Sequence, residues 1–190
     1  MIIMLASHRV LLSGKSQREK DMYKLVLAAH IELTHYDAGA ITFGCLDDRF
    51  HWLFEDLVAQ LEYDGGFEHT DRVVYAGGGH DIAADQTSSQ AALFDQIAKS
   101  VELHHTPSVV VTTHEDCGVF GEEAKCGGDR RKQFLFHLTR HREIEEAIVA
   151  RYSQFLEKVR HFYLSINGVI EFDPWQELTE EDAVAVALAA

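Results

Sequence analysis

Two short stretches carry side chains that could bind a metal ion. The first, TFGCLDDRF at residues 42–50, places Cys45 just before Asp47 and Arg49. The second, THEDCG, separates His114 from Cys117 by two residues. Two thiolates and an imidazole suit zinc, and zinc sites with three protein ligands keep a fourth position open for catalysis. We therefore predict a catalytic Zn²⁺ site with Cys45, His114 and Cys117 as ligands.

Asp47 and Arg49 add a carboxylate and a guanidinium beside this ligand set. A carboxylate there can accept a hydrogen bond from metal-bound water, orient that water, or displace it as a fourth ligand. A guanidinium that binds Asp47 with two hydrogen bonds would keep it off the metal. If the chain stays extended after Cys45, then Asp47 and Arg49 point to the same side as Cys45, and Leu46 and Asp48 point away.

The surrounding sequence predicts strands that alternate with helices. The runs AITFG, DRVVYAGGG and SVVVTTH are typical of buried strands. Helical spacing of apolar residues follows in residues 50–66 and 87–105, with Thr87 and Gln90 in capping-box spacing, and again from about Asp129 to Arg160. The last segment, HFYLSINGVIEFD, predicts a hairpin or edge strand that turns at Asn167 and Gly168.

This alternation favours an α/β fold with a central, largely parallel β-sheet flanked by helices and a C-terminal edge strand. Sites in such sheets form outside the carboxyl ends of the strands, where GCLDDR, AGGGHD and THEDCG fall. We expect one domain over residues 1–190. It comprises an N-terminal arm and helix (1–39, opening at Ser16), a zinc-site core (40–128), and C-terminal helices with an edge strand (129–190).

Composition narrows the class of protein. The formal net charge of −14 disfavours binding to nucleic acid or to an anionic membrane surface. The apolar N-terminal stretch has no basic leader, which argues against a secretory signal, and no run approaches the roughly 20 apolar residues of a membrane span. The three cysteines are too few for a disulfide framework, so we expect reduced thiols and a cytoplasmic protein.

The two motifs resemble the paired signature of the β-class carbonic anhydrases. That family carries a Cys-x-Asp-x-Arg segment and a downstream His-x-x-Cys-Gly segment, matched here by residues 45–49 and 114–118. YAGGG lies between them, where the family has an Ala-Gly turn. The resemblance extends from about Ala40 to Phe120 and continues more weakly into the late strand FYLSINGVIEFD.

The resemblance implies a zinc enzyme that reversibly hydrates carbon dioxide to bicarbonate and a proton, by attack of a zinc-bound hydroxide on carbon dioxide held against an apolar wall. Asp47 and Arg49 would be the dyad that controls the fourth position. Protomers of the family pair into dimers or larger assemblies in which N-terminal helices wrap the partner. The helix from Ser16 to Leu33 is the candidate for that role, and a homodimer or dimer-based oligomer is expected.

The sequence departs from the family at several positions. Asp48 stands where serine is usual, and Val74 and Tyr75 replace polar residues before the Ala-Gly turn. A glutamine that often helps to bind substrate has no counterpart that we could place. Three alternatives therefore stay open: hydrolysis of carbonyl sulfide or carbon disulfide at the same site, a non-catalytic zinc protein, and thiol redox chemistry, which lacks Cys-x-x-Cys spacing.

Other residues near the motifs have predicted roles. Gly77, Gly78 and Gly118 are expected to let the backbone approach the zinc cleft closely and to line the substrate pocket. His80 is the candidate proton relay because imidazole titrates near neutrality; His51, His104 and His105 are expected at the surface. Cys126 is expected to be a free thiol, since a fourth protein ligand would close the site.

Overall fold

The computed structural model of this chain describes residues 34–64, 66–84, 87–121, 125–153 and 158–177. Contacts divide the chain into two units, Met1–Thr34 and His35–Ala190, and every element below belongs to the second. The predicted helix from Ser16 to Leu33 lies outside the described residues. Residues 34–39, which the sequence pattern placed at the end of that helix, are not helical.

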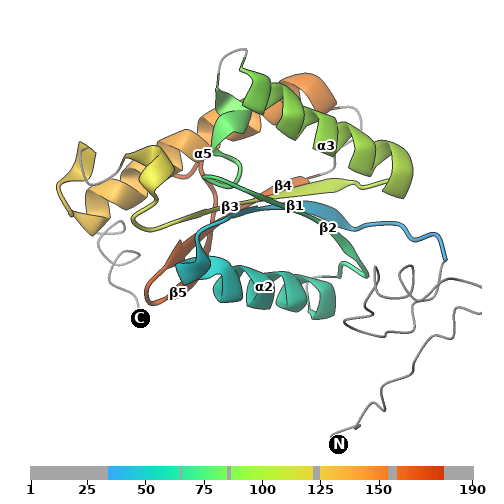
Figure 1. Ribbon diagram of the computed structural model, residues 1–190, viewed down its shortest axis with the longest axis horizontal. Coiled ribbons are helices and arrows are strands. Elements are labelled where there is room, and N and C mark those ends of the chain that lie inside the picture. Colours follow the sequence, from blue (N-terminus) through green and yellow to red (C-terminus); the bar gives the residue numbers. More distant parts are fainter. Residues whose placement is uncertain (1–33, 65, 85–86, 122–124, 154–157, 178–190) are drawn as a thin grey trace, which may run out of the picture. The chain divides into compact units, whose positions relative to one another are not determined.

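Five strands form one sheet in the order β2-β1-β3-β4-β5 (Figure 1). β2, β1, β3 and β4 run parallel to one another, and β5 pairs antiparallel with β4 at one edge. This arrangement confirms the predicted α/β fold with a largely parallel sheet and a C-terminal edge strand. The strands are β1 (Ala40–Cys45), β2 (Thr70–Tyr75), β3 (Ser108–His114), β4 (Lys158–Ser165) and β5 (Gly168–Phe172).

Helices cover both faces of the sheet. Figure 1 shows α3 (Ser88–His104) and α5 (Arg130–Tyr152) on one face and α2 (Asp48–Tyr63) on the other. Side chains alternate along each strand accordingly: Val109 and Val111 pack toward α3 and α5, whereas Val110 packs toward α2. The central strands are therefore buried on both sides. Two short 3₁₀ helices, η1 (His80–Ala83) and η2 (Gly118–Phe120), follow β2 and β3. No helix among the described residues is long and apolar enough to cross a membrane.

Two local predictions are confirmed. Thr87 caps α3, where its side chain accepts a hydrogen bond of 3.0 Å from the backbone N–H of Gln90. β4 and β5 form the predicted hairpin, in which Ser165 pairs with Gly168 across the turn.

The long C-terminal helix is shorter than its sequence pattern predicts. Asp129 caps α5, but the helix ends at Tyr152, and Val159 and Arg160 belong to β4. Phe155, within the predicted helix, lies outside the described residues. The helix stops early because β4 pairs with β3 along its length. This strand pairing outweighs the helical spacing of apolar residues, which continued by chance through a charged segment.

Two buried histidines join α5 to the sheet. The Oγ1 of Thr113 lies 2.9 Å from Nε2 of His141, and the Nδ1 atoms of His141 and His161 are 2.9 Å apart. Nε2 of His161 lies 3.2 Å from a carboxylate oxygen of Glu145. Burial lowers the pKa of His141 well below its usual value and also lowers that of His161, although Glu145 opposes the second shift. Both imidazoles are therefore neutral in the folded protein near pH 7.

This pair predicts that the fold loses stability in mild acid. Below a pH of about 6.5 these histidines bind protons in the unfolded chain but stay neutral in the folded protein. The free energy of unfolding therefore falls by roughly 1.4 kcal/mol per pH unit for each such histidine. Denaturant unfolding at pH 7.5 and 5.5, with chelator present to remove metal effects, checks this. The decline should be smaller for His141→Gln; an equal decline in both proteins would contradict the assignment.

Candidate metal centre

The fold brings Cys45, His114 and Cys117 together. Cys45 ends β1, His114 ends β3, and Cys117 lies immediately before η2. Because β1 and β3 are parallel neighbours, their carboxyl ends meet at one edge of the sheet. One donor atom from each of the three residues lies within 4.8 Å of the other two, and all three side chains are buried. Around a tetrahedral zinc ion such atoms would be roughly 3.3–3.8 Å apart, which falls within this limit.

The imidazole of His114 is oriented for metal binding. Its Nδ1 lies 2.8 Å from the backbone carbonyl oxygen of Glu115, which can only accept, so Nδ1 donates. In the neutral ring, Nε2 then carries the free lone pair. Nε2 is buried and has no hydrogen-bond partner among the described residues. A buried polar atom without a partner is costly, and a metal ion between the two sulfurs would satisfy it. The residues present therefore fit zinc.

Without a metal ion, the Cys117 thiol donates a hydrogen bond to Cys45. A hydrogen bond from Cys117 lowers the pKa of Cys45 to about 4 despite burial, with help from His114 and from the N–H of Gly77, which lies 3.3 Å from Sγ. The same hydrogen bond, together with burial, raises the pKa of Cys117. Burial lowers the pKa of His114, but the hydrogen bonds with Cys45 and the Glu115 carbonyl oxygen, together with the negative charges of Cys45 and Asp47, raise it overall. A metal ion that binds here would displace these protons.

Asp47 lies beside this group and is held by Arg49. The guanidinium binds both carboxylate oxygens, with Nη2 to Oδ2 at 2.7 Å and Nε to Oδ1 at 3.1 Å. Hydrogen bonding to Arg49 lowers the pKa of Asp47 to about 2, so the carboxylate is ionised at neutral pH. Its Oδ2 is 3.9 Å from Nε2 of His114, which places it next to the ligand atoms.

The backbone conformation that brings Asp47 and Arg49 together differs from the prediction. The chain does not stay extended after Cys45, because α2 begins at Asp48. Asp47 caps this helix, and its Oδ1 accepts a hydrogen bond of 3.0 Å from the backbone N–H of Arg49. Helix capping therefore turns both side chains toward each other. Leu46 and Asp48 are exposed.

Arg49 also binds a third residue, which sequence analysis missed. Its Nη1 donates to Oδ2 of Asp116 at 3.0 Å, and its Nη2 donates to the Asp116 carbonyl oxygen at 3.1 Å. Asp116 has a positive φ of 56°, an uncommon conformation for a residue with a side chain. Arg49 thus joins the start of α2 to the loop that carries His114 and Cys117. The two acidic residues between these ligands, Glu115 and Asp116, were the available signal.

Two further contacts support His114. Phe50, directly after Arg49, stacks on the His114 ring with 4.5 Å between ring centroids. The Glu115 carboxylate pairs with Arg130 and accepts a hydrogen bond of 3.1 Å from the backbone N–H of Ile166. These contacts fix the loop after β3 from three sides. Nothing in the spacing of Glu115 and Arg130 could have predicted their pairing.

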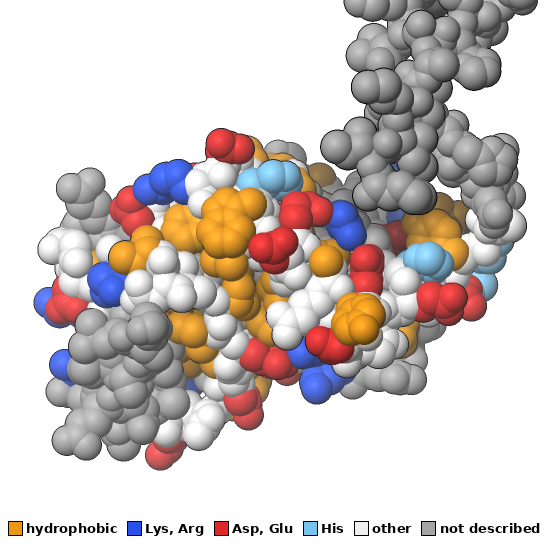
Figure 2. Space-filling view, turned by 90° about the horizontal axis from the view of Figure 1, so that it is seen from below, with side chains coloured by type: hydrophobic (Ala, Val, Ile, Leu, Met, Phe, Trp, Pro, Cys, Tyr) orange, Lys and Arg blue, Asp and Glu red, His pale blue; other side chains and the backbone are white. Residues whose placement is uncertain are grey.

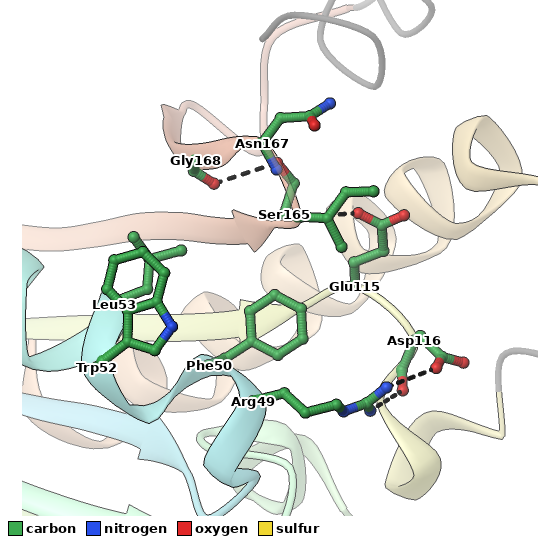
Figure 3. Close-up of a pocket in the computed structure, with 10 residues that line it drawn as sticks. Arg49, Phe50, Trp52, Leu53, Glu115, Asp116, Ser165, Asn167 and Gly168 are labelled. Atoms are coloured by element: carbon green, nitrogen blue, oxygen red, sulfur yellow. Dashed lines mark hydrogen bonds and ion pairs between the residues drawn. The ribbon is translucent and has the colours of Figure 1, made fainter.

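A cavity of about 520 Å³ opens beside the dyad (Figure 3). In Figure 3 the Arg49 side chain reaches Asp116 at one side of the cavity, while Phe50, Trp52 and Leu53 form an apolar wall. The other lining residues are Glu115, Ser165, Ile166, Asn167 and Gly168. Cys45, Asp47, His114 and Cys117 are not among its lining residues, so the cavity adjoins the site through Arg49, Phe50, Glu115 and Asp116.

The residues predicted for the substrate pocket lie elsewhere around the ligands. Gly77 contacts Cys45 through its N–H, whereas Gly118 has open space around it. Neither these two glycines nor Gly78 line the cavity of Figure 3. His80 is partly buried, and its Nδ1 lies 2.8 Å from Asp81. The roles of the glycines and of His80 stay predictions.

Gly78 provides a test of close backbone packing. It has a φ of +59°, and a Cβ there would lie 2.5 Å from the carbonyl oxygen of Thr112. We expect Gly78→Ala to destabilise the protein by roughly 3 kcal/mol or more, since backbone strain and overpacking add. Gly66→Ala is the matched control, because Gly66 also has positive φ but no atom within 4 Å of the added Cβ; it should cost about 1 kcal/mol. Equal unfolding free energies for Gly78→Ala and Gly66→Ala would contradict this expectation.

Cys126 is buried and lies outside the group that could hold a metal. None of the three cysteines, all of which are described, forms a disulfide.

No protein-family model matches this chain, and no curated protein matches it. Solved structures with a related fold include a carbonic anhydrase from Glaciozyma antarctica, with 16% identity, a TM-score of 0.40, and coverage of 72% of this chain and 83% of that one. A β-carbonic anhydrase from Aspergillus fumigatus shows 15% identity and a TM-score of 0.40 over 80% of this chain and 82% of that one. A structure described as carbon disulfide hydrolase shows 13% identity and a TM-score of 0.37 over 77% and 84%.

Proposed function

We propose that this protein is a zinc-dependent enzyme that reversibly hydrates carbon dioxide to bicarbonate and a proton. The observation that carries the proposal is the position of Asp47. Its carboxylate lies beside the group formed by Cys45, His114 and Cys117, yet it is bound to Arg49 through both oxygens. The group therefore offers three protein ligands and keeps a fourth position available, as catalytic zinc sites do.

The zinc ion, when bound, supplies a nucleophile at neutral pH by lowering the pKa of water. The residues of this chain would do the rest. Ionised Asp47 can only accept a hydrogen bond, so it would orient an attacking hydroxyl group with its lone pair toward the substrate carbon. Arg49 would keep Asp47 off the metal, and Phe50 would exclude water from one side of His114. His80 stays our candidate for carrying the released proton.

Hydrolysis of carbon disulfide or carbonyl sulfide is the second candidate function. The cavity of about 520 Å³ is much larger than a triatomic molecule, and Phe50, Trp52 and Leu53 make one wall apolar. Such a wall would suit carbon disulfide and carbonyl sulfide as well as carbon dioxide, and the space would admit these larger molecules. A non-catalytic zinc protein is less consistent with the site, because structural zinc sites are closed by four protein ligands.

Rapid-mixing assays of the zinc-loaded protein separate these functions. Carbon dioxide hydration is followed by proton release in a pH-indicator assay, and attack on carbon disulfide or carbonyl sulfide by release of sulfide. The proposal predicts hydration well above the uncatalysed rate. Sulfide release without hydration would favour the second function, and neither reaction in a protein with zinc at the cysteines would reject both.

We further propose that the protein works in the cytoplasm, because its reducing environment keeps thiols available for metal. We also propose that the chain forms a homodimer through the face around this cavity. Large apolar side chains are exposed there: Trp52 and Ile166, which line the cavity, are each more than 60% exposed. Figure 2 shows hydrophobic side chains in orange among acidic and basic ones on the side that α2 covers. Clusters of exposed apolar groups mark interaction surfaces.

The dimer proposal predicts that Trp52→Glu weakens self-association. A charge at a buried apolar contact is costly, so the dissociation constant should rise by at least about 100-fold. Analytical ultracentrifugation measures this, and Trp175→Glu, at a residue that is 50% exposed and outside the cavity lining, is the control. A monomeric wild-type protein would contradict the proposal.

A further inference from the structure

A second group of metal-ligand side chains lies apart from the cysteine site. His35, Asp37 and His105 each place one ligand atom within 4.8 Å of the other two. Nδ1 of His105 lies 2.8 Å from Oδ1 of Asp37, and Nε2 of His35 lies 3.9 Å from the same oxygen. All three side chains are more than 60% exposed, so an ion could reach them from solvent.

Backbone contacts hold the two chain segments of this group together. His35 and Asp37 precede β1, whereas His105 follows α3. The N–H of Ala38 donates to the carbonyl oxygen of His104 at 2.9 Å, which fixes one segment against the other. His105 itself has a φ of 50° at the end of α3, a left-handed conformation that directs the chain toward Asp37. The ligand atoms are therefore brought together by the fold, although their side chains are exposed.

Neighbouring histidines complete the surroundings. The His35 ring lies 5.9 Å from the His105 ring and 6.2 Å from the His104 ring, between centroids. His104 is not available as a ligand through Nδ1, because this atom lies 2.8 Å from Asp71. Figure 2 shows histidine side chains in pale blue beside acidic ones in red at the end of this unit where β1 begins and α3 ends, to the right in Figures 1 and 2.

The chemistry of the group selects a class of ion. Imidazole nitrogens suit Zn²⁺, Ni²⁺ and Cu²⁺, whereas Mg²⁺ and Ca²⁺ prefer sites built from oxygen atoms. Two imidazoles and one carboxylate would leave coordination positions for water. The formal net charge of −14 favours cations in general at this surface.

We propose that His35, Asp37 and His105 form a second binding site for a divalent transition-metal ion, zinc first among them, independent of the cysteine site. His105 would bind through Nδ1, with its proton moved to Nε2, and Asp37 would bind through the oxygen that now accepts from His105. This site does not depend on the proposed function, because no ligand is shared between the two groups.

Calorimetric titration of the full, tag-free chain with Zn²⁺ alone tests the proposal. We expect two equivalents per chain, of which the weaker is lost selectively in variants of this group. His105→Asn is the main variant, since asparagine tolerates the left-handed conformation and preserves the end of α3; His35→Gln is the second. Each should weaken the second equivalent by at least about tenfold.

Two controls locate the effect. His51→Ala removes an exposed histidine on α2 outside the group and should leave both equivalents unchanged. Cys117→Ser should remove the tight equivalent and retain the weaker one, which separates this proposal from the proposed enzyme activity. A single equivalent in the wild-type protein, or a second equivalent unchanged by His105→Asn and His35→Gln, would overturn the proposal.

Discussion

Cys117→Ser is expected to abolish metal binding at the cysteine site and, with it, carbon dioxide hydration. Serine is almost the same size as cysteine, but its hydroxyl group does not ionise near neutral pH and is a poor ligand for zinc. Without the ion, the pKa of water lies far above neutral pH, so we expect kcat/KM to fall by at least about 10³-fold. Cobalt substitution gives a readout beyond activity, because thiolate ligands produce an intense charge-transfer absorption.

Cys126→Ser is the matched control for this experiment. Cys126 is buried like Cys117 but does not belong to the ligand group. The variant should retain both the charge-transfer absorption of bound cobalt and the activity of the zinc protein. A Cys117→Ser protein that kept the absorption and the activity would contradict the assignment of Cys117 as a ligand.

Asp47→Asn is expected to reduce hydration by roughly 10²–10³-fold while zinc stays bound, as found when a positioned polar group is removed from an active site. Asparagine can still accept the hydrogen bond from the Arg49 N–H that caps α2, so the helix should form normally. What the variant loses is the charge that binds Arg49 and the lone pairs of one carboxylate oxygen. Zinc content, circular dichroism and hydration rates together measure these effects.

Asp48→Asn provides the comparison at the next position. Asp48 is exposed in the first turn of the same helix and has the same charge, but the described contacts do not join it to Arg49. We expect its rate to stay within about twofold of the wild-type rate, since surface charges contribute little. Equal losses in both variants would show that general negative charge matters rather than the position of Asp47.

The sequence predicted those parts of the structure that depend on local patterns. Apolar runs such as SVVVTTH located the central strands, and the capping box at Thr87 located the start of α3. The positions of Cys45 and His114 at strand ends, with Cys117 in the loop after β3, followed from the rule that parallel strands present their carboxyl ends at one edge. Each of these inferences needs information from only a few neighbouring residues.

Other features depend on contacts between distant segments and had no local signal. Arg160 continued a helical pattern but lies in β4, because pairing with β3 decided its conformation. Asp116 and Glu115 bind Arg49 and Arg130, partners that only the folded chain brings close. Asp47 and Arg49 were correctly paired through an incorrect geometry: the prediction assumed a strand, whereas a helix cap brings them together.

X-ray absorption at the zinc edge, on protein loaded with one equivalent of Zn²⁺, tests the central claim most directly. The proposed site predicts two sulfur atoms at about 2.3 Å from the zinc ion and two nitrogen or oxygen atoms at about 2.0–2.1 Å from it. That result would match a site with Cys45, Cys117 and His114 as ligands and one further light atom, and its loss in Cys117→Ser but not in Cys126→Ser would assign the sulfur atoms. A shell with no sulfur, or with three or more sulfur atoms, would contradict it.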